Sequence, residues 1–289
     1  MPRIDDRLLN SVVYLYKSAQ DAKTGYHSGG SGFLIAIPSK RPNQIFTYVV
    51  TNSHVVRESN ATVVRLNKAD GSTILAETMH DDWWHHPDGD DVAVAEIAIE
   101  GNTSLLNPVF VGIEMFITDE AVREYNIGPG DEVFLAGRLI NHDGRQRNVP
   151  SVRFGSISML PTEPIPHPRG IMQESFLVEL FSLEGYSGGP VFVYFHPFSL
   201  RPGRGKLPAS TTLTNRGLVE RNIGPLLLGV NWGHIHHKEK VIDIEGNPVE
   251  QKWCVKSNSG MAGVVPAWKI KEILYSEELE ERRMQAELR

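Results

Sequence analysis

Short apolar segments separated by turn-forming residues recur along most of the chain. Each segment is rich in Val, Ile, Phe and Tyr and is too short for a typical helix, whereas strands commonly have this length and composition. Gly, Pro and Asn interrupt the segments, as is typical of β-sandwiches and β-barrels. The segments span residues 12–16, 33–37, 46–50, 63–66, 92–99, 133–136, 176–180, 191–194 and 226–230. This pattern predicts an all-β core.

The pattern changes at the C-terminal end. Residues 267–289 carry large apolar side chains in their first half and a dense run of charges afterwards. This predicts a helix that packs through its first turns and is solvated beyond them. Upstream, the turn-rich stretch at residues 126–131 marks the expected boundary between a first unit, residues 1–125, and a second, residues 126–266. Two stretches, residues 196–224 and 234–260, are too long for tight turns and are expected to be long loops.

Composition and charge exclude several classes of protein. The 289 residues are 40% hydrophobic and 22% charged, which is ordinary for a globular protein, and the formal charge of −6 provides no basic field for nucleic acid or anionic membrane. Cys254 is the only cysteine, so no intramolecular disulfide can form. The first ten residues lack the apolar run of a signal peptide, and no segment is long enough to span a bilayer. We therefore expect a cytoplasmic protein.

Three segments contain residues with the chemistry of a serine hydrolase. Ser187 lies in the sequence GYSGGP, where glycine backbone N–H groups can face a reacting carbonyl, while His54 lies in TNSHVV and Asp91 precedes an apolar strand. A serine hydroxyl needs a base to become a good nucleophile, and a carboxylate orients that base. The order His, Asp, Ser is that of chymotrypsin-type enzymes, whereas subtilisin-type enzymes have Asp, His, Ser and α/β-hydrolases have Ser, Asp, His.

At these residues the chain resembles the trypsin-like serine peptidases, and most of all the bacterial Deg-type protease domain. The stretch GSGFLI at residues 30–35 and the glycine-containing stretch at residues 260–266 extend the similarity. The resemblance implies two six-stranded antiparallel β-barrels of the chymotrypsin type, followed by the C-terminal helix. The barrel of residues 1–125 would carry His54 and Asp91, and the barrel of residues 126–266 would carry Ser187 and the specificity pocket. We expect no PDZ domain after the helix.

The resemblance also implies a role for each residue of the site. Ser187 would be the nucleophile, His54 the general base and Asp91 the carboxylate that orients His54. The backbone N–H groups of Gly185 and Ser187 would form the oxyanion hole. No cofactor and no metal are expected. Tyr186 replaces the aspartate that pairs with a new N-terminus in digestive trypsins. Activity is therefore expected to be constitutive or controlled by loop ordering or by a regulatory protein partner.

The same resemblance places a pocket that selects the substrate. Phe181 would lie at its base, where trypsin has an aspartate, and we therefore expect cleavage after small or medium-sized apolar residues. The walls would be formed by Asn231, Trp232, Gly233, Gly263 and Val265. The edge at residues 229–233 would pair with an extended polypeptide substrate, and the stretch at residues 234–260 would either limit which substrates enter or be a solvated excursion.

Three other functions compete with a serine peptidase. The α/β-hydrolase nucleophile elbow has the pattern G-x-S-x-G, but it requires a helix after the serine, and Pro190 followed by an apolar strand does not fit. The histidines at residues 85 and 86 and those at residues 234, 236 and 237 lack zinc-protease spacing, although a metal-sensing role stays open. A binding or regulatory module that kept the fold and lost catalysis is the main alternative.

Overall fold

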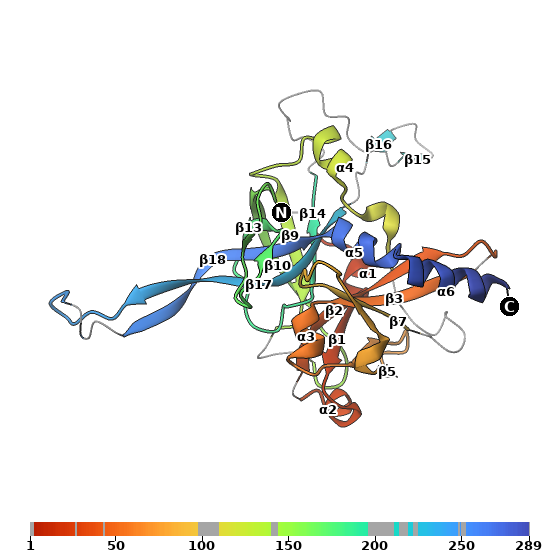
Figure 1. Ribbon diagram of the computed structural model, residues 1–289, viewed down its shortest axis with the longest axis horizontal. Coiled ribbons are helices and arrows are strands. Elements are labelled where there is room, and N and C mark those ends of the chain that lie inside the picture. Colours follow the sequence, from red (N-terminus) through yellow and green to blue (C-terminus); the bar gives the residue numbers. More distant parts are fainter. Residues whose placement is uncertain are drawn as a thin grey trace.

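The computed structural model describes the chain except for residues 1–2, 27, 43, 98–109, 140–143, 196–210, 214–218, 222–224, 248, 250–252 and 289. Two β-rich halves lie side by side, helices α5 and α6 of the C-terminal segment lie along them, and a long two-stranded hairpin projects from one side (Figure 1). None of the helices in the described part of the chain is long and apolar enough to cross a membrane.

The first half is an eight-stranded sheet with strand order β5-β4-β1-β2-β3-β7-β6, and β8 pairs in parallel with β2. Over the described residues this sheet has two open ends, at β5 and at the three-residue strand β6, so it forms a half-barrel. The expected pair of complete six-stranded barrels is therefore not confirmed for this half. Its strands are β1 (Val12–Tyr16), β2 (Ser28–Pro38), β3 (Ile45–Thr51), β4 (Val63–Asn67), β5 (Thr73–Glu77), β6 (Trp83–His85), β7 (Ala93–Glu96) and β8 (Val111–Gly112).

The second half is a closed barrel with strand order β10-β13-β18-β17-β14-β9. Its strands are β9 (Glu132–Gly137), β10 (Ser151–Met159), β13 (Phe176–Glu179), β14 (Pro190–Val193), β17 (Leu226–Lys240) and β18 (Cys254–Pro266). Two small hairpins, β11 (Ile165–Pro166) with β12 (Met172–Gln173) and β15 (Thr211–Leu213) with β16 (Val219–Arg221), lie outside the barrel sheet. The prediction of a mostly β protein is confirmed.

One of the two predicted loops is a strand pair instead. Residues 234–240 continue β17 and pair with β18 as far as Lys240 opposite Cys254, and the pair extends far from the barrel (Figure 1). Both faces of this hairpin contact solvent, so it lacks the apolar alternation by which strands are identified from sequence. The other predicted loop, residues 196–224, lies mostly outside the described residues.

Buried side chains from both halves form one continuous hydrophobic core. It includes Phe33 and Val50 from the first sheet and Phe134, Val191 and Val264 from the barrel. Helix α5 (Ala267–Leu274) adds Ile270 to it and lies against β7 of the first sheet and β17 of the barrel. Docking of the C-terminal segment thus joins the two halves.

The C-terminal segment consists of two helices and packs further along than the sequence predicts. Helix α6 (Glu277–Leu288) follows α5 and buries Leu279 and Arg283. Arg283 donates to the hydroxyl of Tyr48 at 3.1 Å, and the Glu287 carboxylate accepts from the backbone N–H of Lys40 at 2.8 Å. Tyr48 lies in β3 and Lys40 just after β2, so the helix sequence alone contains no signal for these polar partners. The remaining helices are α1 (Asp6–Asn10), α2 (Ala19–Thr24), α3 (Ser53–Arg57) and α4 (Asp119–Glu124), with short turns η1 (His80–Asp82) and η3 (Ile113–Met115).

Candidate active site

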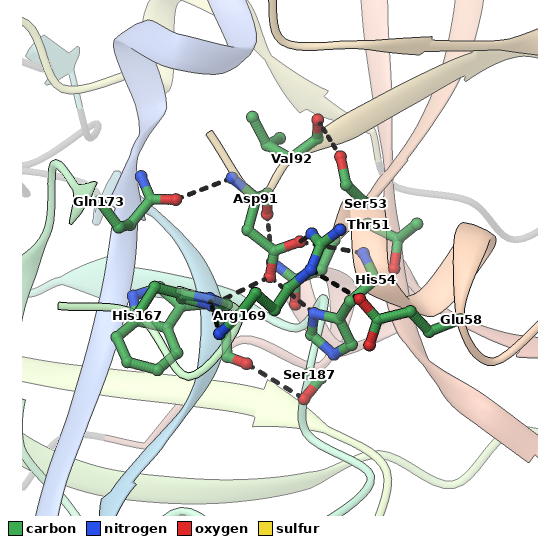
Figure 2. Close-up of polar contacts among 12 residues, drawn as sticks. Thr51, Ser53, His54, Glu58, Asp91, Val92, His167, Arg169, Gln173 and Ser187 are labelled. Carbon is green, nitrogen blue, oxygen red and sulfur yellow. Dashed lines mark hydrogen bonds and ion pairs between the residues drawn. The ribbon is translucent and has the colours of Figure 1, made fainter. Parts of the chain in front are cut away.

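His54 lies in the short helix α3, which begins directly after strand β3. The buried side chain of Asn52 donates to the backbone carbonyl of Asp91 at 2.7 Å, and this bond places α3 beside the turn before β7. The His54 Nδ1 atom lies 2.6 Å from Asp91 Oδ2, and the backbone N–H of His54 donates to Asp91 Oδ1 at 2.9 Å (Figure 2). The imidazole side chain is 20% exposed and its carboxylate partner is fully buried. Two residues distant in sequence thus form a tight pair.

The Asp91 carboxylate has further partners from the second half. Arg169 Nη1 lies 3.2 Å from Asp91 Oδ1, while Arg169 Nε lies 2.6 Å from Glu58 on the other side. His167 Nε2 lies 3.5 Å from Asp91 Oδ2, which is an ion-pair distance but too long for a good hydrogen bond. Burial alone would raise the pKa of Asp91, but the neighbouring His167 and His54 side chains outweigh it and hold that pKa well below its ordinary value. The carboxylate is therefore ionised at neutral pH.

Ser187 lies in the turn between β13 and β14, in the same cleft as His54. Its hydroxyl donates to the backbone carbonyl of Trp232 at 3.4 Å, and no hydrogen bond joins it to His54 in the described structure. The structure thus places His54 and Ser187 in one cleft, with Asp91 buried behind His54 and the serine turned toward Trp232.

The turn around Ser187 is fixed against the first sheet. Ser31 donates its backbone N–H to the Ser187 carbonyl at 2.8 Å and its hydroxyl to the Gly185 carbonyl at 2.7 Å. Gly188 has φ +86°, and a Cβ there would lie 2.0 Å from the Ser31 carbonyl oxygen, so only glycine fits. Within the described part of the chain, the N–H groups of Gly185 and Ser187 bind no acceptor. Both remain available to a ligand.

The predicted pocket residues occupy different environments. Trp232 and Gly233 line the cleft. Asn231 is buried and donates to the Tyr186 carbonyl at 3.1 Å. Gly263 lies so close to the Trp232 indole that a Cβ would be 2.1 Å from the ring, and Val265 is fully buried. Phe181 is 54% exposed and is not among the residues that line the cleft, so its expected role in selecting the substrate stays a prediction.

Four residues of the site could not be identified from the sequence. Glu58, His167 and Arg169 line the cleft, and Gln173 accepts from the backbone N–H of Asp91 at 2.8 Å. His167, Arg169 and Gln173 lie in or beside the β11–β12 hairpin, which reaches Asp91 from the second half. Because no fixed spacing links this hairpin to the triad residues, only the tertiary fold reveals the contact.

The adjacent histidines have separate polar partners. His85 Nδ1 lies 2.9 Å from the Ser53 hydroxyl, and burial lowers the pKa of His85 to about 4, with smaller contributions from Arg57 and Arg169. His86 is buried, and its ligand atom lies with those of Asp88 and Glu272 within 4.8 Å of one another, a spacing that could hold a metal ion. Lys269 Nζ, 3.6 Å from Glu272 and 3.2 Å from Asp90, already supplies a positive charge beside this group.

Comparisons with known proteins extend this picture. A family model described as a trypsin-like peptidase domain matches residues 30–193, more than half of the chain. The chain is similar to the solved structure of the MamO protease domain from Magnetospirillum magneticum in its apo form, at 15% identity and a TM-score of 0.53, over 93% of this chain and 98% of that one. This likeness supports the chymotrypsin-like fold.

Two other solved structures match with lower scores. Deg5 is 21% identical with a TM-score of 0.45, over 78% of this chain and 81% of that one. The Rv3671c protease of M. tuberculosis H37Rv, in an inactive form, is 15% identical with a TM-score of 0.46, over 93% of this chain and 89% of that one. A comparison with curated protein sequences finds no match to the chain.

Proposed function

The chain belongs to the family of trypsin-like peptidase domains, and from that premise we propose that it is a serine endopeptidase acting on polypeptides. The observation that carries this proposal is the His54–Asp91 pair, 2.6 Å apart, whose imidazole lines the same cleft as Ser187. A partly exposed imidazole with a fully buried carboxylate behind it is the arrangement that general-base catalysis requires.

In the proposed reaction, Ser187 Oγ attacks the substrate carbonyl carbon while His54 Nε2 takes the hydroxyl proton. The ionised Asp91 stabilises the imidazolium that forms, and the free N–H groups of Gly185 and Ser187 bind the oxyanion. His54 then gives its proton to the departing amine, leaving an acyl-enzyme that water hydrolyses by the reverse sequence of proton transfers. The Ser187 hydroxyl must exchange its bond with the Trp232 carbonyl for one to His54.

We also propose that the enzyme prefers small or medium-sized apolar residues before the scissile bond. The position expected at the base of the pocket is Phe181, which offers no carboxylate to a substrate Lys or Arg. Cleavage-site mapping by mass spectrometry on a proteome-derived peptide library tests this preference. Strict cleavage after Arg or Lys would contradict it.

A fluorophosphonate probe tests the activity itself, because it labels only an activated serine. We expect the folded chain to be labelled, labelling to be lost in Ser187→Ala, and the labelling rate of Asp91→Asn to fall by about 10⁴-fold. Ser156→Ala, a change in β10 away from the cleft, serves as the matched control and should label normally. Absence of labelling in a folded chain would contradict the proposal.

A catalytically silent binding module is the second candidate. Two observations favour it: the Ser187 hydroxyl binds the Trp232 carbonyl instead of His54, and Arg169 occupies one oxygen of Asp91. A silent module would bind peptides equally well before and after the Ser187→Ala substitution, and it would leave every peptide intact. Peptide binding without turnover by the unaltered chain would therefore support this second function.

A further inference from the structure

Strand β17 has an open edge that leads away from the cleft. One edge pairs with β18 along the strand, whereas the other pairs with β14 only as far as Val230. Beyond that residue no described strand covers the second edge, and the hairpin extends away from the barrel (Figure 1). We call residues 234–240 of β17 and 254–258 of β18 the arm. An uncovered strand edge presents backbone N–H and C=O groups to which another extended chain can bind.

The arm begins inside the cleft. His234 and His236 line it together with His54 and Ser187, and the centroids of their rings are 4.4 Å apart, so both side chains lie on the same face of the strand. Because side chains alternate between faces along a strand, Lys238 and Lys240 lie on the same face as the two histidines and form one row with them. One row of histidine and lysine side chains therefore runs outward from the cleft, and its positive charge lies mainly at the lysines, because burial lowers the pKa of His234.

The lysine charges on this face have no acidic partner within the described part of the chain, whereas Glu184 lies near His234 at the cleft end. Lys238 lies directly opposite Lys256 of β18, and opposed residues of an antiparallel pair share a face. Two like charges in this position destabilise a hairpin unless an anion lies between them. Lys238, Lys240 and Lys256 form no ion pair with a residue that the structure describes. Glu239 lies on the opposite face, where its carboxylate accepts from the Ser257 hydroxyl at 2.7 Å.

We propose that the arm extends the substrate-binding cleft: an extended polypeptide segment adds to the open edge of β17 as a further strand, and acidic side chains at alternate positions bind the row from His234 to Lys240. This inference rests on the proposed peptidase function and specifies its substrate class. At about 3.4 Å per residue, the seven residues of this edge would accompany roughly seven residues of substrate. Short peptides would not reach the lysines.

Binding to the inactive Ser187→Ala chain tests the arm without requiring catalysis. The probes are fluorescein-labelled twelve-residue peptides of alternating Glu and Thr, of alternating Gln and Thr, and of Glu and Thr with N-methylated backbone. Exposed ion pairs each change affinity by about 1.4- to fivefold. We expect the Glu peptide to bind at least about fivefold more tightly than the Gln peptide, with the difference decreasing as salt rises, and N-methylation to abolish binding.

Substitutions in the arm then show which side chains account for binding of the Glu peptide. In the Ser187→Ala background, Lys238→Gln with Lys256→Gln should remove most of the preference for the Glu peptide over the Gln peptide, while Glu239→Gln on the opposite face should leave binding unchanged or slightly tighter. Equal binding by the lysine variant and its parent, or full binding of the N-methylated peptide, would overturn the proposal. A failed fluorophosphonate test would refute catalysis and leave this binding result standing, so the two failures can be distinguished.

Discussion

Asp91 shows how a buried charge is compensated by residues from distant parts of the chain. Its carboxylate is fully buried, and it contacts His54 from the first half and Arg169 from the second. Removing one partner of a buried ion pair is costly, because the remaining charge stays out of water without compensation. Arg169 is 26% exposed, so solvent reduces this cost.

We predict that Arg169→Met destabilises the protein by about 2 kcal/mol, since Asp91 loses its only guanidinium partner in the described structure while keeping His54. Glu58→Gln is the matched control, because it removes the exposed partner of the same arginine and should cost less than about 0.5 kcal/mol. Urea unfolding at pH 7 measures both. Equal losses of unfolding free energy in the two variants would show that the Arg169–Asp91 contact contributes no more to stability than the exposed Arg169–Glu58 contact.

His85 predicts a pH dependence of stability that is separate from that of Asp91. Its pKa is about 4 in the folded chain and about 6.5 when unfolded. Below pH 6.5 the unfolded chain therefore binds a proton that the folded chain does not, so stability falls as pH decreases toward 4 and is regained above 6.5. The lowered pKa of Asp91 acts only below about pH 4, where its protonation removes stability.

Between pH 7 and pH 5 we expect His85 to account for a loss of about 1 kcal/mol, after allowance for its partial exposure. His85→Gln keeps a polar group near Ser53 and should remove this part of the pH dependence. Urea midpoints of both proteins at the two pH values provide the measurement. An identical pH dependence in the variant would mean that His85 does not titrate as proposed.

At the scale of elements, the turn at residues 185–189 is shaped by the first sheet as much as by its own sequence. Ser31 binds two of its carbonyls, and Thr51 donates its hydroxyl to the Ser31 carbonyl at 2.7 Å. The turn therefore has its observed shape only when the two halves are packed together.

Gly188→Ala should distort this turn, because its Cβ would lie 2.0 Å from the Ser31 carbonyl oxygen at a φ of +86°. We predict a loss of fluorophosphonate labelling of more than about 100-fold, with destabilisation of about 3 kcal/mol or more. Gly128→Ala is the control, because no atom lies within 4 Å of its added Cβ, and it should label and unfold like the parent. Normal labelling of Gly188→Ala would show that the turn tolerates displacement.

Strands could be predicted from the sequence where they are fully buried, because burial on both faces requires a continuous run of apolar residues. Strand β1 is buried at all five positions and strand β14 at all four, so both appear in the sequence as continuous apolar segments. The outer part of the arm is solvated on both faces, and its sequence contains no such signal. The triad candidates could be found because each lies in a recognisable segment, whereas Arg169 and His167 reach Asp91 only through the placement of a small hairpin.

At the scale of the whole molecule, the two halves share one core. Residues of the half-barrel and of the barrel belong to the same buried cluster, and helix α5 lies against both. The family could be identified from the sequence alone, whereas the open first sheet could not, because closure depends on pairing between strand edges far apart in the chain.

We therefore predict a single unfolding transition, even though chains of this length commonly unfold through intermediates. Scanning calorimetry at pH 7 should give a calorimetric enthalpy equal to the van't Hoff enthalpy. Two resolved transitions would instead mean that the shared core is too weak to couple the halves.

The arm also has a practical consequence. Its outer residues, from His237 to Lys240 on one strand, are exposed and contribute nothing to the shared core. Loops and hairpins of this kind can be exchanged without rebuilding the scaffold that carries them. Protein engineers could thus graft a different hairpin at this place and, if the chain is the peptidase proposed above, direct it to new targets without changing its proposed catalytic residues.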